Sequence, residues 1–189
     1  SGNGLCVVDA QWFEHARPCE IFGLPLALCP PEETIWQKAF IMERERYDGA
    51  DVAHLLLDCG PTLDWRRLLE RFGEHWPVLL SHLVLFRYIF PSDTLSAPAW
   101  VLDGLLDRAR AEAGAEADGS DWCRGTLLAA RQYAIDVQHK GRQDPRLPPA
   151  GRMTAGEIAQ WEAWLESQSH SSPPPATRAD GTQAIETGA

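Results

Sequence analysis

The charged residues that could do chemistry are concentrated in one segment, KAFIMERERYDGAD, at positions 38–51. On a helix at about 100° per residue, the aromatic and aliphatic side chains of positions 35–42 form one apolar arc. Glu43 and Arg46 project from within that arc, three residues apart, where they could pair with each other. A charged pair on the side that faces a core is costly unless it is satisfied. The pattern therefore indicates either an internal salt bridge that fixes the helix end or a pair that borders a polar pocket.

Three further polar residues follow on the next predicted helix. Asp51, His54 and Asp58 are spaced i, i+3 and i+7, so they share one face. Two carboxylates and one imidazole could bind a metal, although no further ligand spacing supports this. The same stripe could be a solvated face, or it could supply an active-site carboxylate. The residues alone leave these alternatives open.

The other reactive side chains have simpler interpretations. His75 and His82 lie on either side of Pro77 and are expected to be surface and core residues. Cys19 and Cys29 are expected to be buried as small hydrophobic residues. The five cysteines form no C-x-x-C pair, which favours reduced thiols in a cytoplasmic protein over a disulfide framework. The sequence contains no G-x-S-x-G, H-E-x-x-H, P-loop or G-x-G-x-x-G motif.

The elements that must position these residues are mostly helices. Residues 5–8 and 20–29 read as short strands, the second interrupted by Gly23 and Pro25 as a turn or bulge. Helical patterns follow at 31–46, 51–60, 65–76, 77–90, 97–114, 121–141 and 154–167. Asp64 is the expected cap of the third helix, and Thr154 with Glu157 forms a capping box for the last. The sequence predicts a mainly α fold with a small β remnant at the N-terminus (α+β). Residues 1–30 carry the β part, 31–167 form a helical domain and 168–189 a disordered tail.

Composition narrows the class of protein. The chain has 189 residues, of which 44% are hydrophobic and 23% are charged, as in globular proteins. Its net charge of −10 argues against non-specific binding to DNA or to anionic membranes, although a local basic pocket could still bind one nucleotide. The longest apolar run, at 78–90, is too short and too polar to cross a membrane. Because the chain begins SGNG without methionine, we expect it to be the carboxyl-terminal part of a longer protein.

The segment EETIWQKAFIMERERYDGADVAHLL, at positions 32–56, resembles the later part of bacterial nucleotidyltransferases of the DNA polymerase β superfamily. It is most similar to the abortive-infection type, which includes toxins of toxin–antitoxin systems. In that family a glutamate precedes a helix that carries a lysine, and an aspartate follows about a dozen residues later. Glu32 or Glu33, then Lys38, then Asp51 match this order. The similarity extends through FGEHWPVLLSHLVLFRYIFP and RGTLLAARQY to about Trp164.

The sequence departs from the family pattern at two places. Ala50 occupies the position of a basic residue before the aspartate, and His54-Leu55 replaces an Asp-Leu pair. The metal-binding half of the family, with its D-x-D pair on a strand, would have to precede Ser1. The resemblance therefore implies a truncated nucleotidyltransferase fold followed by a helical bundle, and a fragment that is inactive alone.

The resemblance also implies a reaction and roles. The complete protein would transfer a nucleotidyl group from an NTP to an acceptor hydroxyl on RNA, protein or a small molecule. Two Mg²⁺ ions would be held by the upstream carboxylates, so no metal ligand falls in this chain. Lys38 would face the phosphates with support from Arg44 or Arg46, and Asp51 would act as base or orient the acceptor. The alternatives are a non-catalytic helical interaction module, such as a degenerate nucleotidyltransferase, and a small metal protein that uses His54.

Overall fold

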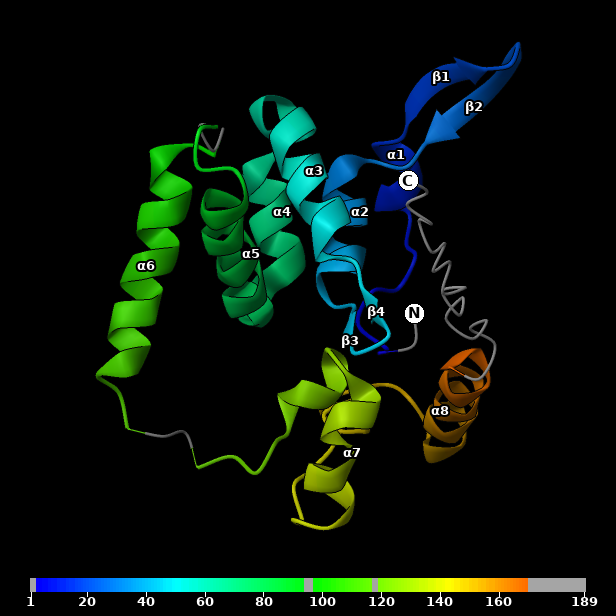
Figure 1. The fold of residues 1–189 in the computed structure, drawn as a ribbon, viewed down its shortest axis with the longest axis vertical. Helices are drawn as coiled ribbons and strands as arrows, with labels where there is room; N and C mark the ends of the chain where they lie inside the picture. Colours follow the sequence, from blue (N-terminus) through cyan, green and yellow to red (C-terminus); the bar gives the residue numbers. More distant parts are fainter. Residues whose placement is uncertain (1–2, 94–96, 117–118, 170–189) are drawn as a thin grey trace, which may run out of the picture.

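The fold is mainly helical, with two small antiparallel sheets near the N-terminus, as the sequence predicts. The structure is a computed structural model that describes residues 3–93, 97–116 and 119–169. Figure 1 shows helices α2 to α5 grouped together, α6 along one side, α7 and α8 at one end, and the hairpin β1–β2 projecting at the other end. The predicted disordered tail falls mostly on residues 170–189, which lie outside the described residues.

The elements follow one another along the chain as α1 (Gln11–Glu14), β1 (Arg17–Ile21), β2 (Leu24–Leu28), α2 (Pro31–Ala39), β3 (Met42–Glu43), β4 (Arg46–Tyr47), α3 (Gly49–Cys59), η1 (Gly60–Thr62), α4 (Trp65–Phe72), η2 (Gly73–His75), α5 (Trp76–Ile89), α6 (Ala99–Ala113), η3 (Arg124–Leu127), α7 (Ala130–Gln138) and α8 (Ala155–Ser169).

Helix α5 is the centre of the hydrophobic core. It packs against α2, α3, α4 and α6 and buries Leu79, Leu83 and Phe86 completely. Each such side chain contributes roughly 1.5–3 kcal/mol when it leaves water. His82 lies among them, only 3% exposed, and its Nε2 is 3.1 Å from the carbonyl oxygen of Ala39. His82 is therefore a core residue, as predicted. None of the helices in the described ranges is long and apolar enough to cross a membrane.

The predicted helix starts at Asp64 and Thr154 are confirmed. Asp64 Oδ1 accepts hydrogen bonds from the backbone N–H groups of Arg66 and Arg67, both at 3.1 Å, and so caps α4. At the start of α8, Glu157 Oε2 accepts from the N–H of Thr154 at 2.7 Å, while Thr154 Oγ1 accepts from the N–H of Glu157 at 3.2 Å. This reciprocal pair is a capping box.

The predicted helix over 31–46 is wrong in its second half. Helix α2 ends at Ala39, and residues 42–47 form the hairpin β3–β4, in which Glu43 is paired with Arg46. A continuous helix would have placed both charges in the apolar arc. The hairpin instead leaves Arg46 exposed and turns Glu43 towards the N-terminus of α7, where it accepts a hydrogen bond from Ala130 N at 2.8 Å.

The β part also differs from prediction. Residues 5–8 form no strand. The predicted strand over 20–29 instead covers the end of β1, the turn at Phe22 and Gly23, and the whole of β2. Both turn residues have positive φ, +54° and +78°, as in the two-residue turns that match strand twist. The turn predicted at Gly23 is confirmed. The hairpin stands away from the helices in Figure 1, so Cys19 is only half-buried and Cys29 is exposed, contrary to prediction.

The predicted helix over 121–141 is interrupted. Residues 121–123 are extended because they exchange backbone hydrogen bonds with Gln143, from Cys123 N to Gln143 O and from Gln143 N to Asp121 O, both at 2.8 Å. The 3-10 helix η3 and the shorter α7 follow. This arrangement places η3 and α7 beside the hairpin β3–β4, where Met42 N donates to Leu128 O at 3.0 Å.

Candidate functional site

Lys38 and Asp51 are in direct contact. Lys38 lies in the last turn of α2 and Asp51 in the first turn of α3, and these two helices pack together because the hairpin β3–β4 reverses the chain between them. Lys38 Nζ is 2.6 Å from Asp51 Oδ2 and 3.1 Å from Asp48 Oδ2. The structure thus brings together the two residues predicted to be catalytic, which are thirteen positions apart.

Asp48 is the member of this site that sequence reasoning missed. It occupies the N-cap position of α3 and is almost buried, with 10% of its side chain exposed. Arg46 donates to both carboxylate oxygens of Asp48, from Nε at 3.2 Å and from Nη2 at 3.1 Å. An aspartate directly before a predicted helix, in the Asp-Gly of YDGAD, was the available signal.

The electrostatics of this group follow from its contacts. Burial opposes ionisation of Asp48, but the hydrogen bonds from Arg46 and Lys38 outweigh it and hold the pKa of Asp48 below its ordinary value. The hydrogen bond to Asp51, helped by Asp48, raises the pKa of Lys38. We call Lys38, Arg46, Asp48 and Asp51 the ion-paired cluster. Its two cations and two carboxylates sum to zero charge, so the cluster has no net positive charge to attract an anion.

Three members of the cluster are accessible to solvent. The side chains of Arg46 and Asp51 are 60% and 54% exposed and that of Lys38 is 28% exposed, whereas that of Asp48 is 10% exposed. Arg44 lies exposed at the turn of the β3–β4 hairpin. The structure therefore places Arg46, and not Arg44, in the ion-paired cluster.

Glu43 and Arg46 face each other across the hairpin but form no salt bridge, because Arg46 pairs with Asp48. The predicted internal salt bridge is wrong. Both residues instead line a cavity of about 200 Å³ formed by the hairpin, η3 and α8. Its wall is mainly apolar, whereas the alternative interpretation predicted a polar pocket. Burial raises the pKa of Glu43, an effect opposed by the N–H of Ala130.

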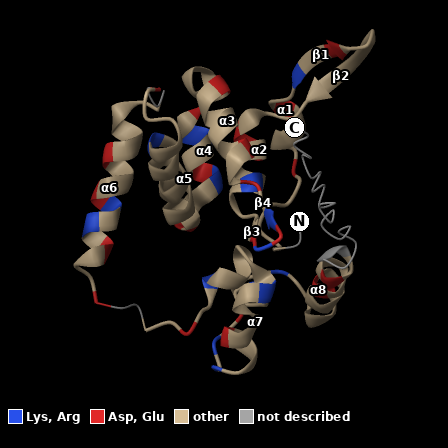
Figure 2. Ribbon diagram, in the orientation of Figure 1, with Lys and Arg blue, Asp and Glu red and all other residues tan. Residues whose placement is uncertain are grey.

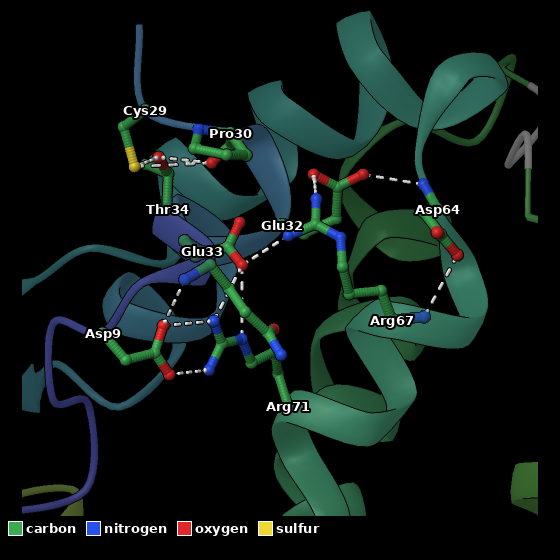
Figure 3. Close-up of polar contacts among 10 residues, drawn as sticks. Asp9, Cys29, Pro30, Glu32, Glu33, Thr34, Asp64, Arg67 and Arg71 are labelled. Carbon is green, nitrogen blue, oxygen red and sulfur yellow. Dashed lines mark hydrogen bonds and ion pairs between the residues drawn. The ribbon is translucent and has the colours of Figure 1, made fainter. Parts of the chain in front are cut away.

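Glu32 and Glu33 form a second charged group, at the other end of α2 (Figure 3). Arg67 contacts both carboxylates, and Arg71 joins Glu33 at 3.2 Å to Asp9 at 2.6 Å. The two glutamates are 2% and 0% exposed. We call these five residues the buried ion network. It joins α2 to α4 and to the segment before α1, and it leaves neither glutamate accessible to a ligand.

The predicted Asp51, His54 and Asp58 stripe shows no metal-binding arrangement. Asp51 is held by Lys38, and the ring of His54 lies against that of Phe90, with centroids 6.0 Å apart. Across the described ranges, no group of three or more histidine, cysteine, aspartate or glutamate residues is placed to hold a metal ion. The five cysteines form no disulfide.

Comparison of the chain with protein-family models, with curated proteins and with solved structures gave no match. The function must therefore be inferred from the residues and their geometry.

Proposed function

We propose that this chain is the carboxyl-terminal part of a nucleotidyltransferase that moves a nucleotidyl group from an NTP to an acceptor hydroxyl. The observation that carries the proposal is the contact between Lys38 and Asp51 at 2.6 Å, on an accessible edge of the α2–α3 junction. These are the residues that the family resemblance selects, whereas helical periodicity gives them no special position. A lysine and an aspartate that meet from different helices suit charge handling during phosphoryl chemistry.

Each residue of the cluster has a role in this reaction. The triphosphate takes the place of Asp51 as the partner of Lys38, while Arg46 and Asp48 keep the ammonium in position. The released Asp51 carboxylate then accepts the proton of the acceptor hydroxyl. The acceptor oxygen forms a bond to the α-phosphorus, and the bond to the pyrophosphate oxygen breaks. Pyrophosphate leaves with the electron pair of that bond.

Magnesium is implied by the resemblance, where it neutralises the triphosphate. The carboxylates of the ion-paired cluster and the buried ion network do not fit such a site. Asp48 is engaged by Arg46 and Lys38, and Glu32 and Glu33 are buried against Arg67 and Arg71. We expect the ligands of magnesium to lie outside this chain.

Transfer of label tests the proposal. The full-length protein, with any residues encoded upstream of Ser1, is incubated with each α-³²P-labelled NTP, Mg²⁺ and candidate RNA, protein and small-molecule acceptors. Lys38→Ala and Asp51→Ala should each lower incorporation by about a hundredfold or more. Arg124→Ala is the matched control, because Arg124 pairs with Glu74 at the surface. Absence of label with every NTP, or equal incorporation by wild type and both variants, would refute the proposed roles of Lys38 and Asp51.

A second candidate, a non-catalytic interaction module, is favoured by one observation. The β1–β2 register places Leu24, Leu26 and Leu28 on one face with Ile21, and all four are at least 41% exposed. Figure 2 shows β2 without a charged residue. An exposed aliphatic face of this kind marks an interaction surface. If this candidate is correct, Leu24→Asp abolishes the cellular activity of the protein and Lys38→Ala leaves that activity intact. The nucleotidyltransferase proposal instead predicts that Lys38→Ala abolishes the activity.

A further inference from the structure

The turn of the β1–β2 hairpin contains a residue that does not suit it. Phe22 has φ +54°, and no other non-glycine residue in the described ranges has a positive φ. Two-residue turns of this kind favour asparagine and glycine, and a bulky side chain in the left-handed region is a costly exception. Phe22 is also fully exposed, so packing within the chain does not offset this cost. A strained and exposed aromatic residue points to a contact with another molecule.

The hairpin presents this ring at its tip and has poor edges for pairing with a further strand. Hydrogen-bonded and outward-facing pairs alternate from the turn, starting with the hydrogen-bonded pair Ile21–Leu24. Pro18 and Pro25 both fall on outward-facing pairs, so each removes one donor from a free edge of the hairpin. Strands of five residues carry the turn about 17 Å from their base. A partner would therefore meet the tip and the aliphatic face of the hairpin.

The same chain has a cavity that fits an aromatic ring. Its volume is about 200 Å³, and an apolar cavity of about 150 Å³ is enough to hold benzene. Trp161 and Trp164 on α8 line it, with ring centroids 4.7 Å apart and planes inclined by 26°, opposite apolar wall from Phe40 and Leu127. Aromatic rings pack favourably in stacked or edge-to-face arrangements. Because Arg46 and Trp164 are both exposed, the cavity opens at the surface.

The tip of the hairpin and the cavity lie on separate parts of the chain. Figure 1 shows the hairpin projecting at one end of the molecule, whereas β3–β4 and α8, which enclose the cavity, lie near the other end. Two copies related by a two-fold axis would each place a hairpin tip in the cavity of the other, so that the contact is made twice. The charges agree with this pairing, because Glu20 is the one carboxylate of residues 17–28 and Arg46 is the cation of the cavity lining.

We propose that a second copy of this chain is the partner, and that Phe22 of each copy fills the cavity of the other. The ring packs against Trp161 and Trp164, and the aliphatic face behind it covers the apolar rim. This contact supplies a partner for the surface that favours the interaction module. It does not depend on nucleotidyl transfer, since it uses neither Lys38 nor Asp51.

Sedimentation equilibrium of the full chain tests the contact. Over about 5–500 µM, in about 0.3 M NaCl to screen the net charge of −10, the average mass should rise from one chain towards two. Phe22→Asn should weaken association by about thirtyfold or more, as expected for a central aromatic residue of an interface. Asparagine tolerates positive φ better than phenylalanine, so the variant should fold at least as well as wild type. Tyr88→Asn is the matched control, because Tyr88 is an exposed aromatic residue on α5, outside both surfaces.

A mixture of two variants provides the sharper test. Phe22→Asn keeps the cavity but lacks the ring, whereas Trp164→Ala keeps the ring but lacks one indole of the cavity wall. Each variant alone should associate weakly, and an equimolar mixture should associate more tightly than either, because one complete contact is restored. In wild-type samples that mix labelled and unlabelled chains, magnetisation transfer from the Phe22 ring to indole protons of the other chain would locate the contact.

The outcomes separate this inference from the proposed function. The inference is overturned if the wild-type chain stays monomeric over the whole concentration range, or if Phe22→Asn associates as tightly as wild type. A monomer that binds phosphatidylcholine vesicles through Phe22 would also overturn it and would assign the tip to a membrane surface. Self-association with the predicted order of variants, in a protein that transfers no label, would uphold the contact and overturn the transferase.

Discussion

Helix α2 carries a charged group at each end, and the two groups differ in what surrounds them. At the N-terminal end, Glu33 is fully buried between Arg67 and Arg71. At the C-terminal end, Asp51 contacts Lys38 with more than half of its side chain in solvent. The residue types are similar, yet the first group is closed to ligands and the second is open. Exposure, and not the identity of the charges, distinguishes a structural ion network from a candidate site.

The energetic consequences follow from the same difference. Removing one partner of a buried pair leaves an uncompensated charge and costs about 3–5 kcal/mol. An exposed pair contributes a median of about 0–1 kcal/mol, because water and salt screen it. Stability therefore depends mainly on the buried ion network, while the ion-paired cluster can exchange partners at little cost.

The largest effect is expected in the buried ion network. Arg67→Met should lower the free energy of unfolding by about 3–5 kcal/mol, since Glu32 and Glu33 both lose their contact with Arg67. Urea denaturation followed by circular dichroism measures this loss. Arg124→Met, in a surface pair, is the control and should cost less than about 1 kcal/mol. If the two variants lose equal stability, the contrast between the two ends of α2 is wrong.

A smaller effect is expected in the dependence of folding stability on pH. Burial lowers the pKa of His82 below 6.5, so the unfolded chain takes up this proton before the folded chain does. Stability should be fully present above pH 6.5 and fall as the pH drops below it, by at most about 1.4 kcal/mol per pH unit for one proton. The pKa of His75 is lowered in the same direction and adds to this slope.

The variant His82→Gln isolates the first contribution, since glutamine can still donate to the Ala39 carbonyl. Urea midpoints at pH 7, 6 and 5 should show a flatter pH dependence than wild type. Identical curves would show that His82 is not the titrating group. The contact between His82 and the Ala39 carbonyl lies at the C-terminal end of α2, next to Lys38 in the sequence.

A substitution in the ion-paired cluster should change the free energy of unfolding only slightly. Lys38→Met should cost about 1 kcal/mol or less, because Asp51 is solvated and Asp48 keeps both hydrogen bonds from Arg46. The urea midpoint measures the change. A loss of about 3 kcal/mol or more would mean that Lys38 is as structural as Arg67.

The smallest effect is a salt dependence of a few tenths of a kcal/mol. At 1 M salt the Debye length falls to about 3 Å, so exposed ion pairs are screened while buried ones are not. The cost of Lys38→Met should shrink between 0.05 M and 1 M NaCl, and the cost of Arg67→Met should stay constant. Paired urea titrations at both concentrations measure this. Equal salt responses would remove the distinction between the two groups.

Local sequence patterns predicted the features that depend on local chemistry. The caps at Asp64 and Thr154, the turn at Gly23 and the core position of His82 follow from residues within a few positions of one another. The helix over 31–46 failed because its end is set from a distance. Glu43 is held by Ala130, 87 residues later, and Met42 by Leu128. Such contacts outweigh helical periodicity and leave no trace in a short window.

The same distinction between local and distant contacts applies to the candidate site. Lys38 and Asp51 were indicated by family resemblance, and their contact could not be derived from spacing because it depends on the hairpin between them. Asp48 lies three residues before the predicted helix start at Asp51, but its pairing with Arg46 and Lys38 is tertiary. The cavity could not be predicted, since its walls come from residues as distant as Phe40 and Trp164.

The bond between Glu43 and Ala130 has a consequence for how the chain could be divided. Everything that handles charge at the end of α2 lies before α4, whereas much of the cavity wall is built from η3, α7 and α8. One cleavage between α6 and η3, followed by loss of the released piece, would strip the indoles from the cavity and free Glu43 Oε1 from the N–H of Ala130. The cleavage would leave intact the part of the chain that carries Lys38, Asp48 and Asp51. The ion-paired cluster and much of the cavity wall are thus encoded in separable stretches of one polypeptide.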